Sequence, residues 1–315
     1  MDSTFFDKLN DSVIERIKEL STNEDATPNE NLVNLVQNQL YENYNQLNLI
    51  YENCLHELDN LIGLNEVKEE IKKLVNYLIY YKKVSNSITL DKINLNMIFR
   101  GNPGTGKTTV AKIISNLLFE LGFTTSDNVV EATPRDFIAG YVGQTAIKAK
   151  DLIDRAKGGV IFIDEAYTFV TKGDEKGGSY ALEAITEIIK EMEKNETVFI
   201  FAGYQNEMNE FINLNPGIKS RIGYDIYFED YSPEDLLKMF LNKLNRTGLK
   251  IEKNAISKVM EIIKERSKVK NFGNGRMIDN LYNEIIREHA FMSSKEFDEE
   301  RLLTISLQAV ENVKI

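Results

Sequence analysis

Nine consecutive residues have the types and spacing to bind a triphosphate. Gly101-Asn102-Pro103-Gly104-Thr105-Gly106-Lys107-Thr108-Thr109, here called the phosphate loop, fits the pattern G-x-x-x-x-G-K-[ST]. Glycines let the backbone turn tightly and present N–H groups to a phosphate. Lys107 can reach the β- and γ-phosphates, and the Thr108 hydroxyl can ligate Mg²⁺. The loop therefore predicts a site for ATP or a similar triphosphate together with Mg²⁺.

The segments beside the phosphate loop are those that the motif requires. Residues 93–99 alternate between apolar and polar, which is typical of a strand, and apolar residues from Val110 to Leu121 recur at helical spacing. The start of that helix adds a positive dipole end near the phosphate. The alternative is a chance glycine-rich turn, and the strand–helix context disfavours it. A dinucleotide fingerprint is excluded, because no third glycine follows Gly104 and Gly106 at the required offset.

Two adjacent carboxylates follow a second apolar strand about 60 residues downstream. Val160-Ile161-Phe162-Ile163 is continuously apolar and ends at Asp164-Glu165. Such a run is typical of a buried parallel strand, which delivers its last residues to the ligand-binding edge of an α/β sheet. We expect Asp164 to hold Mg²⁺, through a water molecule, and Glu165 to orient and polarise the attacking water.

Two shorter segments are weaker candidates. Ile62-Gly63-Leu64 forms a small apolar turn before a helix expected over residues 65–83, and such a turn can back an adenine ring. Tyr141 lies in Gly140-Tyr141-Val142-Gly143, in a polar setting. From the residues alone, a core position for Tyr141 is favoured over a functional one.

Length, charge and cysteine usage exclude several classes of protein. The 315 residues can form two domains, and they include no apolar run long enough to cross a membrane. The beginning of the chain lacks a secretory pattern, and Cys54 as the single cysteine excludes an intrachain disulfide, so we expect a cytoplasmic protein. Residues 1–60 carry 12 of the 49 acidic side chains and 3 of the 38 basic ones. This acidic balance argues against nucleic acid as the main partner.

The order of predicted elements divides the chain into three parts. An acidic helical extension over residues 1–55 includes a short amphipathic helix over 5–20, a capping pattern at 27–30, and a long amphipathic helix or helix pair. Residues 56–230 contain the strands, and residues 172–179 are expected to form a flexible loop. Residues 231–315 are expected to be mostly helical, with helices over about 234–246, 254–268 and 276–293.

Together these motifs resemble the AAA+ ATPases, in the subfamily of red-type Rubisco activase and stage V sporulation protein K. The resemblance covers residues 56–300 and excludes the acidic extension. It implies an α/β fold with a parallel sheet sandwiched by helices, followed by a small all-α lid. Its most specific parts are the phosphate loop, residues 140–143, 158–167 and 201–204, and Asn215-Pro216-Gly217-Ile218-Lys219-Ser220-Arg221-Ile222.

The resemblance implies roles for residues that the motifs alone do not explain. Tyr141 matches the pore aromatic that grips a polypeptide in a hexameric ring, which favours a functional position over a core one. Arg221 resembles the arginine finger that completes the site of a neighbouring subunit, and Arg276 resembles the second sensor in the lid. Ile62, Gly63 and Leu64 would line the adenine pocket. Tyr204 stands where many AAA+ proteins have a polar sensor.

The leading expectation is an ATP-dependent remodeller of a protein client, acting as a homo-oligomer, most simply a hexamer. The alternative is a nucleotide-switched scaffold that recruits a partner through the N-terminal helices without threading it. A DNA-associated motor is a third hypothesis, which the charge distribution disfavours. The sequence names no client.

Overall fold

A parallel sheet of five strands forms the centre of the larger of two compact units, residues 1–56 and 57–315, in the computed structural model. The structure describes residues 30–84, 92–141, 143–170, 175–294 and 297–314. The strands are β1 (Met97–Gly101), β2 (Val129–Ala132), β3 (Val160–Ile163), β4 (Val198–Gly203) and β5 (Tyr224–Phe228), in the order β2-β3-β4-β1-β5. Because all four pairings are parallel, β1 and β3 end at the same edge of the sheet.

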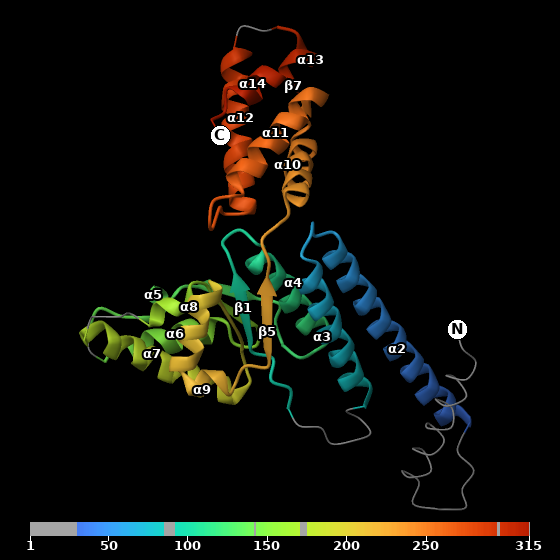
Figure 1. Ribbon diagram of the computed structural model, residues 1–315. Helices are drawn as coiled ribbons and strands as arrows, with labels where there is room; N and C mark the ends of the chain where they lie inside the picture. Colours follow the sequence, from blue (N-terminus) through green and yellow to red (C-terminus); the bar gives the residue numbers. More distant parts are fainter. Residues whose placement is uncertain (1–29, 85–91, 142, 171–174, 295–296, 315) are drawn as a thin grey trace, which may run out of the picture. The chain divides into compact units, whose positions relative to one another are not determined.

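Helices cover both faces of this sheet (Figure 1). Helices α3 (Asn65–Val84) and α4 (Lys107–Glu120) lie on one side. The other side carries α5 (Pro134–Phe137), α6 (Thr145–Arg155), the 3₁₀ helix η1 (Ala166–Phe169), α7 (Glu175–Lys194), α8 (Gln205–Leu214) and α9 (Pro216–Lys219). The predicted sandwich of a parallel sheet between helices is therefore confirmed.

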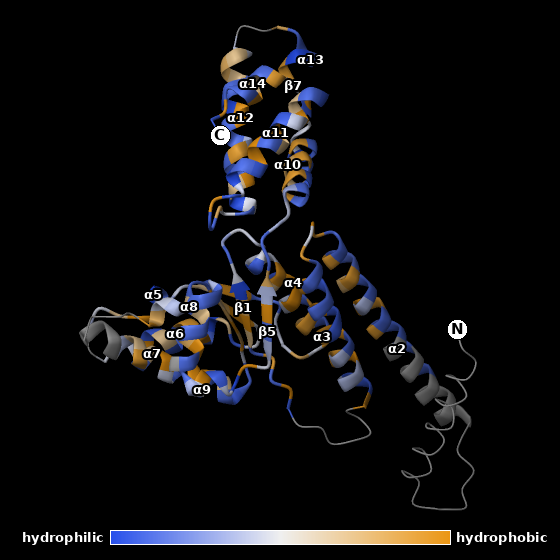
Figure 2. Ribbon diagram, viewed as in Figure 1, coloured by the Kyte–Doolittle hydropathy of each residue, from blue (hydrophilic) through white to orange (hydrophobic). Residues whose placement is uncertain are grey.

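Side chains along the central strands point alternately to the two faces of the sheet and so form two apolar layers. Ile161, Ile163, Phe199 and Phe201 share one core cluster with residues of α6, α7 and α8. The intervening Phe162 turns to the opposite face, where its ring approaches that of Phe99 at 6.4 Å. Figure 2 shows hydrophobic residues along the strands and hydrophilic ones on the outer surfaces of the helices. Both faces of the sheet are thus buried, which explains the continuous apolar runs in its strands.

The lid has a separate apolar core. It consists of α10 (Pro233–Thr247), α11 (Lys253–Arg266), α12 (Gly275–Met292), α13 (Glu299–Leu302) and α14 (Leu307–Glu311). Its cluster includes Leu236, Phe240, Ile262 and Leu281, all fully buried. Two short strands, β6 (Lys250–Ile251) and β7 (Thr304–Ile305), pair in parallel. The three long helices were predicted to within two residues, whereas two-residue strands are too short to show a period.

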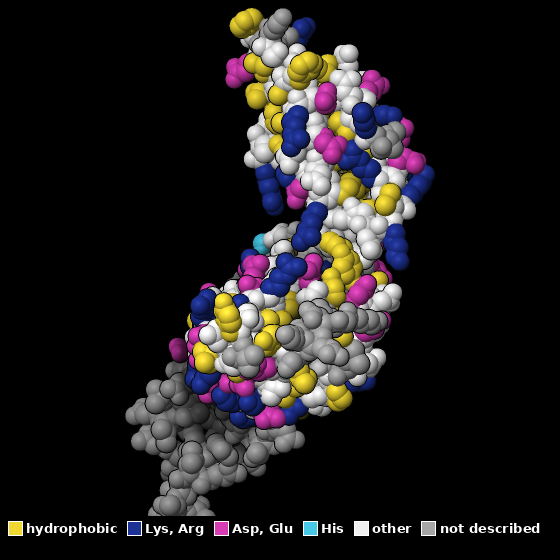
Figure 3. Space-filling view, turned by 90° about the vertical axis from the view of Figure 1, so that its left-hand side faces the viewer, with side chains coloured by type: hydrophobic (Ala, Val, Ile, Leu, Met, Phe, Trp, Pro, Cys, Tyr) yellow, Lys and Arg dark blue, Asp and Glu magenta, His cyan; other side chains and the backbone are white. Residues whose placement is uncertain are grey.

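The first unit contains most of α2 (Glu30–Asp59), a single helix of 30 residues where the sequence left a helix or a helix pair open. The short helix expected over residues 5–20 and the cap at residues 27–29 lie outside the described residues. In the described part of the chain, no helix is both long and apolar enough to cross a membrane. On the face shown in Figure 3, basic and acidic side chains are interspersed.

Two predicted boundaries are wrong for identifiable reasons. The first strand begins at Met97 instead of residue 93, because the Asn96 carboxamide accepts the N–H of Phe199 at 2.9 Å and replaces a backbone pairing there. The loop expected over 172–179 is helical from Glu175 onward. Each glycine in a helix costs only about 1 kcal/mol, which the packing of the rest of α7 on α6 can offset. Residues 172–174 lie outside the described residues.

Candidate active site

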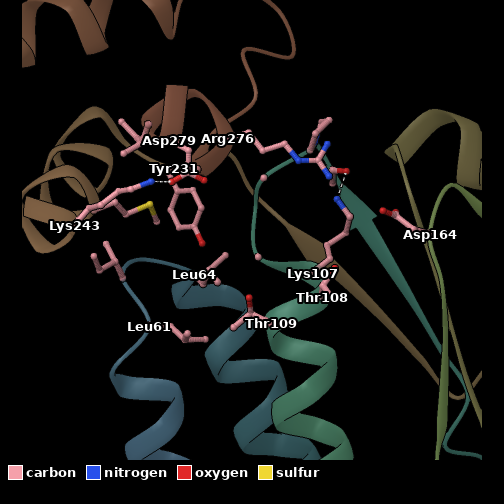
Figure 4. A pocket seen from close by; sticks show the side chains of 18 of the residues that line it. Leu61, Leu64, Lys107, Thr108, Thr109, Asp164, Tyr231, Lys243, Arg276 and Asp279 are labelled. Carbon is pink, nitrogen blue, oxygen red and sulfur yellow. Dashed lines mark hydrogen bonds and ion pairs between the residues drawn. The ribbon is translucent and has the colours of Figure 1, made fainter. Parts of the chain in front are cut away.

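A cavity of about 800 Å³ opens where the phosphate loop, the end of β3 and the lid helices α10 and α12 meet (Figure 4). A volume of this size suits a small-molecule ligand. Residues predicted from the sequence supply much of its lining: Ile62, Leu64, Pro103, Gly104, Gly106, Lys107, Thr108, Thr109, Asp164, Glu165, Tyr204 and Arg276. Gly63, Asn102 and Thr105 belong to the same segments but do not line the cavity.

The phosphate loop turns between β1 and α4 through glycines in the left-handed region. Gly104 has a φ of +73°, and a Cβ there would stand 2.2 Å from the carbonyl oxygen of Gly273. No side chain larger than hydrogen fits this approach without moving backbone. Gly106, with a φ of 91°, is the residue from which α4 starts. In the described part of the chain, the N–H groups of Gly104, Thr105 and Gly106 donate to no other group. They remain available to an anion.

Lys107 is the charged side chain at the centre of the loop. It is 9 % exposed, and its Nζ donates to the carbonyl oxygens of Gly101 and Asn102, each at 2.8 Å. Burial lowers the pKa of Lys107 to about 8, and the Asp164 carboxylate opposes that shift. Burial removes water from the Lys107 ammonium and so disfavours its charged form. A nearby phosphate would stabilise that charged form strongly.

The two predicted carboxylates stand side by side at the end of β3 and both line the cavity. The Asp164 Oδ1 accepts the N–H of Glu165 at 3.0 Å. Glu165 has a φ of 52° and a ψ of 37°, a left-handed conformation that is uncommon for a residue other than glycine. At this turn the chain leaves β3 and starts η1. Strained backbone of this kind is frequent at functional sites.

Two tyrosines stand near these carboxylates. Tyr204 caps α8 and lines the cavity, and its ring lies 5.7 Å from that of Tyr167. Burial raises the pKa of Tyr167 to about 12, and the Glu165 carboxylate adds to the shift. The Tyr167 phenol therefore stays protonated at neutral pH and can donate a hydrogen bond.

The opposite end of the cavity is more apolar. Leu61, Ile62 and Leu64 face it from the turn before α3, and Met239 and Ile278 face it from the lid. Lys243 and Asp279 form an ion pair beside this end, joining α10 to α12 (Figure 4). Gly63 lies behind the lining, where a Cβ would stand 3.1 Å from the Tyr231 ring. An apolar slot with a few polar groups suits a nucleobase and its sugar.

Arg276 is the second residue of α12 and reaches the phosphate-loop end of the cavity (Figure 4). It lowers the pKa of Lys107, as a nearby cation must. Two cations thus share this end of the cavity with Asp164. An anion with several charges between these cations would reduce their repulsion.

Two predicted residues lie away from the cavity. Arg221 donates to the Gly217 carbonyl oxygen at 2.7 Å and forms an ion pair with Glu193. Its position outside the lining is compatible with a role toward another subunit and gives it no role within its own site. Tyr141 is 74 % exposed between α5 and α6, so the core position that the residues alone favoured is wrong.

Several residues of the site were not predicted from the sequence. Tyr231 donates from its hydroxyl to the Thr105 carbonyl oxygen at 3.2 Å. Asn274, Lys243, Asp279 and Tyr167 are further examples. Asn274 stands between two glycines, a pattern typical of a turn with positive φ, and Tyr167 lies in the stretch 158–167 that carries the resemblance. Lys243 and Asp279 are common residues on helices, and Tyr231 lies between β5 and α10, so only the fold brings these three to the cavity.

Comparison with known families covers both domains of the second unit. Residues 97–230 match the family model described as "ATPase family associated with various cellular activities (AAA)", and residues 232–311 match the model of the AAA lid domain.

Characterised relatives align over most of their length. The chain is 34 % identical to stage V sporulation protein K of Bacillus subtilis over 260 residues, which cover 80 % of each protein. It is 38 % identical to the chloroplastic ribulose bisphosphate carboxylase/oxygenase activase of Cyanidioschyzon merolae over 73 % of this chain and 75 % of that one. Protein CbbX of Cereibacter sphaeroides is also 38 % identical, over 72 % and 74 % of the two chains.

Solved structures agree on the fold. The AAA domain of FIGL-1 in complex with ADP superimposes with a TM-score of 0.55 at 15 % identity, covering 80 % of this chain and 81 % of that one. A Thermotoga maritima RuvB variant superimposes with a TM-score of 0.53 at 20 % identity, over 81 % and 69 %. At such identities the likeness concerns the fold alone.

Proposed function

The chain belongs to the AAA family of ATPases and hydrolyses ATP, and we propose that it does so as a ring-forming remodeller of a protein client. Within the family it is of the Rubisco activase and stage V sporulation protein K type. The observation that carries the proposal is the cavity that joins a phosphate loop and two carboxylates to a lid.

ATP binding is assigned to the two ends of the cavity. The free N–H groups of the phosphate loop and the Lys107 ammonium would hold the β- and γ-phosphates. The apolar slot at Ile62 and Leu64 would hold the adenine ring. Arg276 would approach the phosphates from α12 and so connect the lid to the state of the nucleotide. Tyr204, which lines the same cavity, would act as a sensor near the γ-phosphate.

The oxygen donors at the phosphate end fit Mg²⁺ when a triphosphate is present. The Thr108 hydroxyl and the Asp164 carboxylate both line the cavity. No group of three or more histidine, cysteine or acidic side chains within the described residues could hold a metal by itself. Mg²⁺ commonly combines one or two protein oxygens with phosphate oxygens and water, so this donor set suits it. Bound there, Mg²⁺ would neutralise charge on the phosphates.

Glu165 is the residue proposed to activate water. Glu165 is exposed and lines the cavity next to Asp164, and its backbone is in the left-handed region. A Glu165→Gln variant should bind ATP like the wild-type protein and hydrolyse it at least about 100-fold more slowly, because a positioned base contributes about 10²–10⁴ in rate. Glu120→Gln, at the exposed end of α4, is the control. Normal turnover in the Glu165→Gln variant would refute the assignment.

A ring is proposed because Arg221, which resembles an arginine finger, does not line the cavity of its own chain. Its guanidinium bonds Glu193, Gly217 and Ser220 instead. In a ring, Arg221 could approach the γ-phosphate of the neighbouring subunit, where such a cation is worth about 10³–10⁵ in rate. A hexamer is the ring size expected from the resemblance.

A protein client is proposed from Tyr141 and from the relatives. An aromatic side chain that is 74 % exposed on a short loop can grip a polypeptide in the centre of a ring. One relative is named an activase of ribulose bisphosphate carboxylase/oxygenase, which is itself a protein.

The alternative function, a scaffold that recruits a partner, would require the acidic residues 1–55, whereas a threading ring would not. Their deletion would abolish partner recruitment by a scaffold and leave unfolding by a threading ring in place. The cytoplasmic location stays a prediction.

A further inference from the structure

Four consecutive residues of the phosphate loop are bonded to residues 229–232 between β5 and α10, here called the hinge, and to the start of α12. The Asn102 Nδ2 donates to the Asp230 carboxylate at 2.9 Å, and the Tyr231 hydroxyl donates to the Thr105 carbonyl oxygen at 3.2 Å. Between them, the carbonyl oxygens of Pro103 and Gly104 accept from the Asn274 Nδ2 at 3.3 Å and the Gly275 N–H at 3.0 Å.

Asn274 is the side chain at the centre of these contacts. Its Oδ1 accepts the N–H of Tyr231 at 2.9 Å, and its Nδ2 also donates to Asp230 at 2.7 Å. It is fully buried. One carboxamide thus joins three segments, namely the phosphate loop through Pro103, the hinge, and the helix that carries Arg276.

The backbone of Asn274 is strained. Its φ of 47° and ψ of −120° belong to the first central position of a type II′ turn, which glycine normally occupies. The turn is closed by the N–H of Arg276, which donates to the Gly273 carbonyl oxygen at 2.9 Å. Glycine at 274 would remove the strain, so the backbone conformation alone does not explain asparagine there. Its hydrogen bonds do.

These contacts control the direction of the loop's N–H groups. In a trans peptide the N–H points opposite to the carbonyl oxygen, and the described residues contain no cis bond. When the Pro103 and Gly104 carbonyl oxygens turn toward α12, the N–H groups of Gly104 and Thr105 turn the other way. A carbonyl oxygen facing the phosphates would repel them, so holding the carbonyls away prepares the loop for an anion.

We infer that Asn274 is a positioning residue for nucleotide binding, which orders the phosphate loop by holding it to the hinge and to the start of α12. The inference rests on the proposed assignment of the cavity to ATP. It gives the lid a direct connection to the phosphates besides Arg276.

The test compares Asn274→Gly and Asn274→Asp with Asn283→Ala in the full chain, measuring the Kd for fluorescent ADP and the thermal midpoint. Asn283 is exposed on the same helix. Asn274→Gly relieves the strained backbone but loses the buried bonds to Pro103, Asp230 and Tyr231, so its thermal midpoint should fall moderately while ADP binding weakens about tenfold or more. Asn274→Asp keeps the acceptor for the Tyr231 N–H, loses both donated bonds, and faces Asp230 with a like charge. It should weaken binding at least as much.

The outcomes separate this inference from the proposed function. Wild-type Kd values in Asn274→Gly and Asn274→Asp, with normal hydrolysis, would overturn the positioning role and leave the ATPase assignment intact. Failure of the wild-type protein and of Asn283→Ala to bind ADP would overturn both. A fall in ADP affinity at a temperature where the variants are fully folded supports the inference, because a purely structural role would lower the thermal midpoint and leave the affinity of the folded protein unchanged.

Discussion

Replacement of Gly104 by alanine tests how closely the phosphate loop meets the lid. The added Cβ would stand 2.2 Å from the Gly273 carbonyl oxygen and 2.9 Å from the Arg276 nitrogen. Both are backbone atoms, so neither can yield by a rotamer change. The residue would also retain a φ of +73°, which is unfavourable for alanine by about 1–2 kcal/mol. Overlap with backbone adds about 1–3 kcal/mol.

Gly248 provides a matched control for the conformational part of this cost. It has a φ of +76° at the end of α10, and a Cβ there meets nothing within 4 Å. Gly248→Ala should therefore be destabilised only by the cost of the positive φ. That cost lowers Tm by about 2–4 °C per kcal/mol for a domain of 150–250 residues. Gly104→Ala should lower Tm at least about twice as much.

Thermal unfolding of both variants, followed by ADP titration of the folded proteins, completes the test. We expect Gly248→Ala to bind ADP normally and Gly104→Ala to bind it at least about tenfold more weakly, because relief of the overlap must move the loop or the start of α12. Equal falls in Tm for the two variants would show that the loop does not contact residues 273–276 in solution.

Three further predictions concern single residues. Because the lowered pKa of about 8 leaves Lys107 mostly neutral at pH 9 and bound phosphate favours its cation, the Kd for ADP without Mg²⁺ should weaken about tenfold from pH 7 to pH 9. Lys107→Arg should remove this dependence, and a flat profile in the wild-type protein would contradict the reasoning. Mixing inactive Arg221→Ala and Glu165→Gln subunits should restore hydrolysis at about a quarter of the sites, whereas no recovery would argue against a shared site. Tyr141→Ala should keep ATP hydrolysis and lose client remodelling, Tyr141→Phe should keep both, and remodelling by the alanine variant would refute threading.

The phosphate half of the site was predictable because its chemistry is contiguous in the chain. The phosphate loop and the Asp164-Glu165 pair each combine several functional groups within a few residues, next to strands that can be identified from their apolar pattern. The parallel order of β1, β4 and β3 then brings both segments to one edge. The residues and their approximate distance in sequence were sufficient to predict this grouping.

The lid side of the site and the hinge were not predictable in the same way. The bond from Asn274 to Pro103 joins residues 171 positions apart, and that from Tyr231 to Thr105 joins residues 126 apart. The ion pair of Lys243 with Asp279 lies on two amphipathic helices, where a charged residue is ordinary. Such contacts depend on how the lid packs, which no local pattern in the sequence encodes.

The pairing of β1 with β5 explains why the hinge meets the phosphate loop at all. Gly101 is in register with Phe228, so the strand that leads to the loop and the strand that leads to the hinge end together. The Arg100 guanidinium fixes this pairing through two bonds of 2.7 Å to Asp225 on β5. The loop is thus anchored to the sheet at its beginning and bonded to the lid along its carbonyl side. A lid that moved about the hinge would therefore have to break these bonds or carry the loop with it.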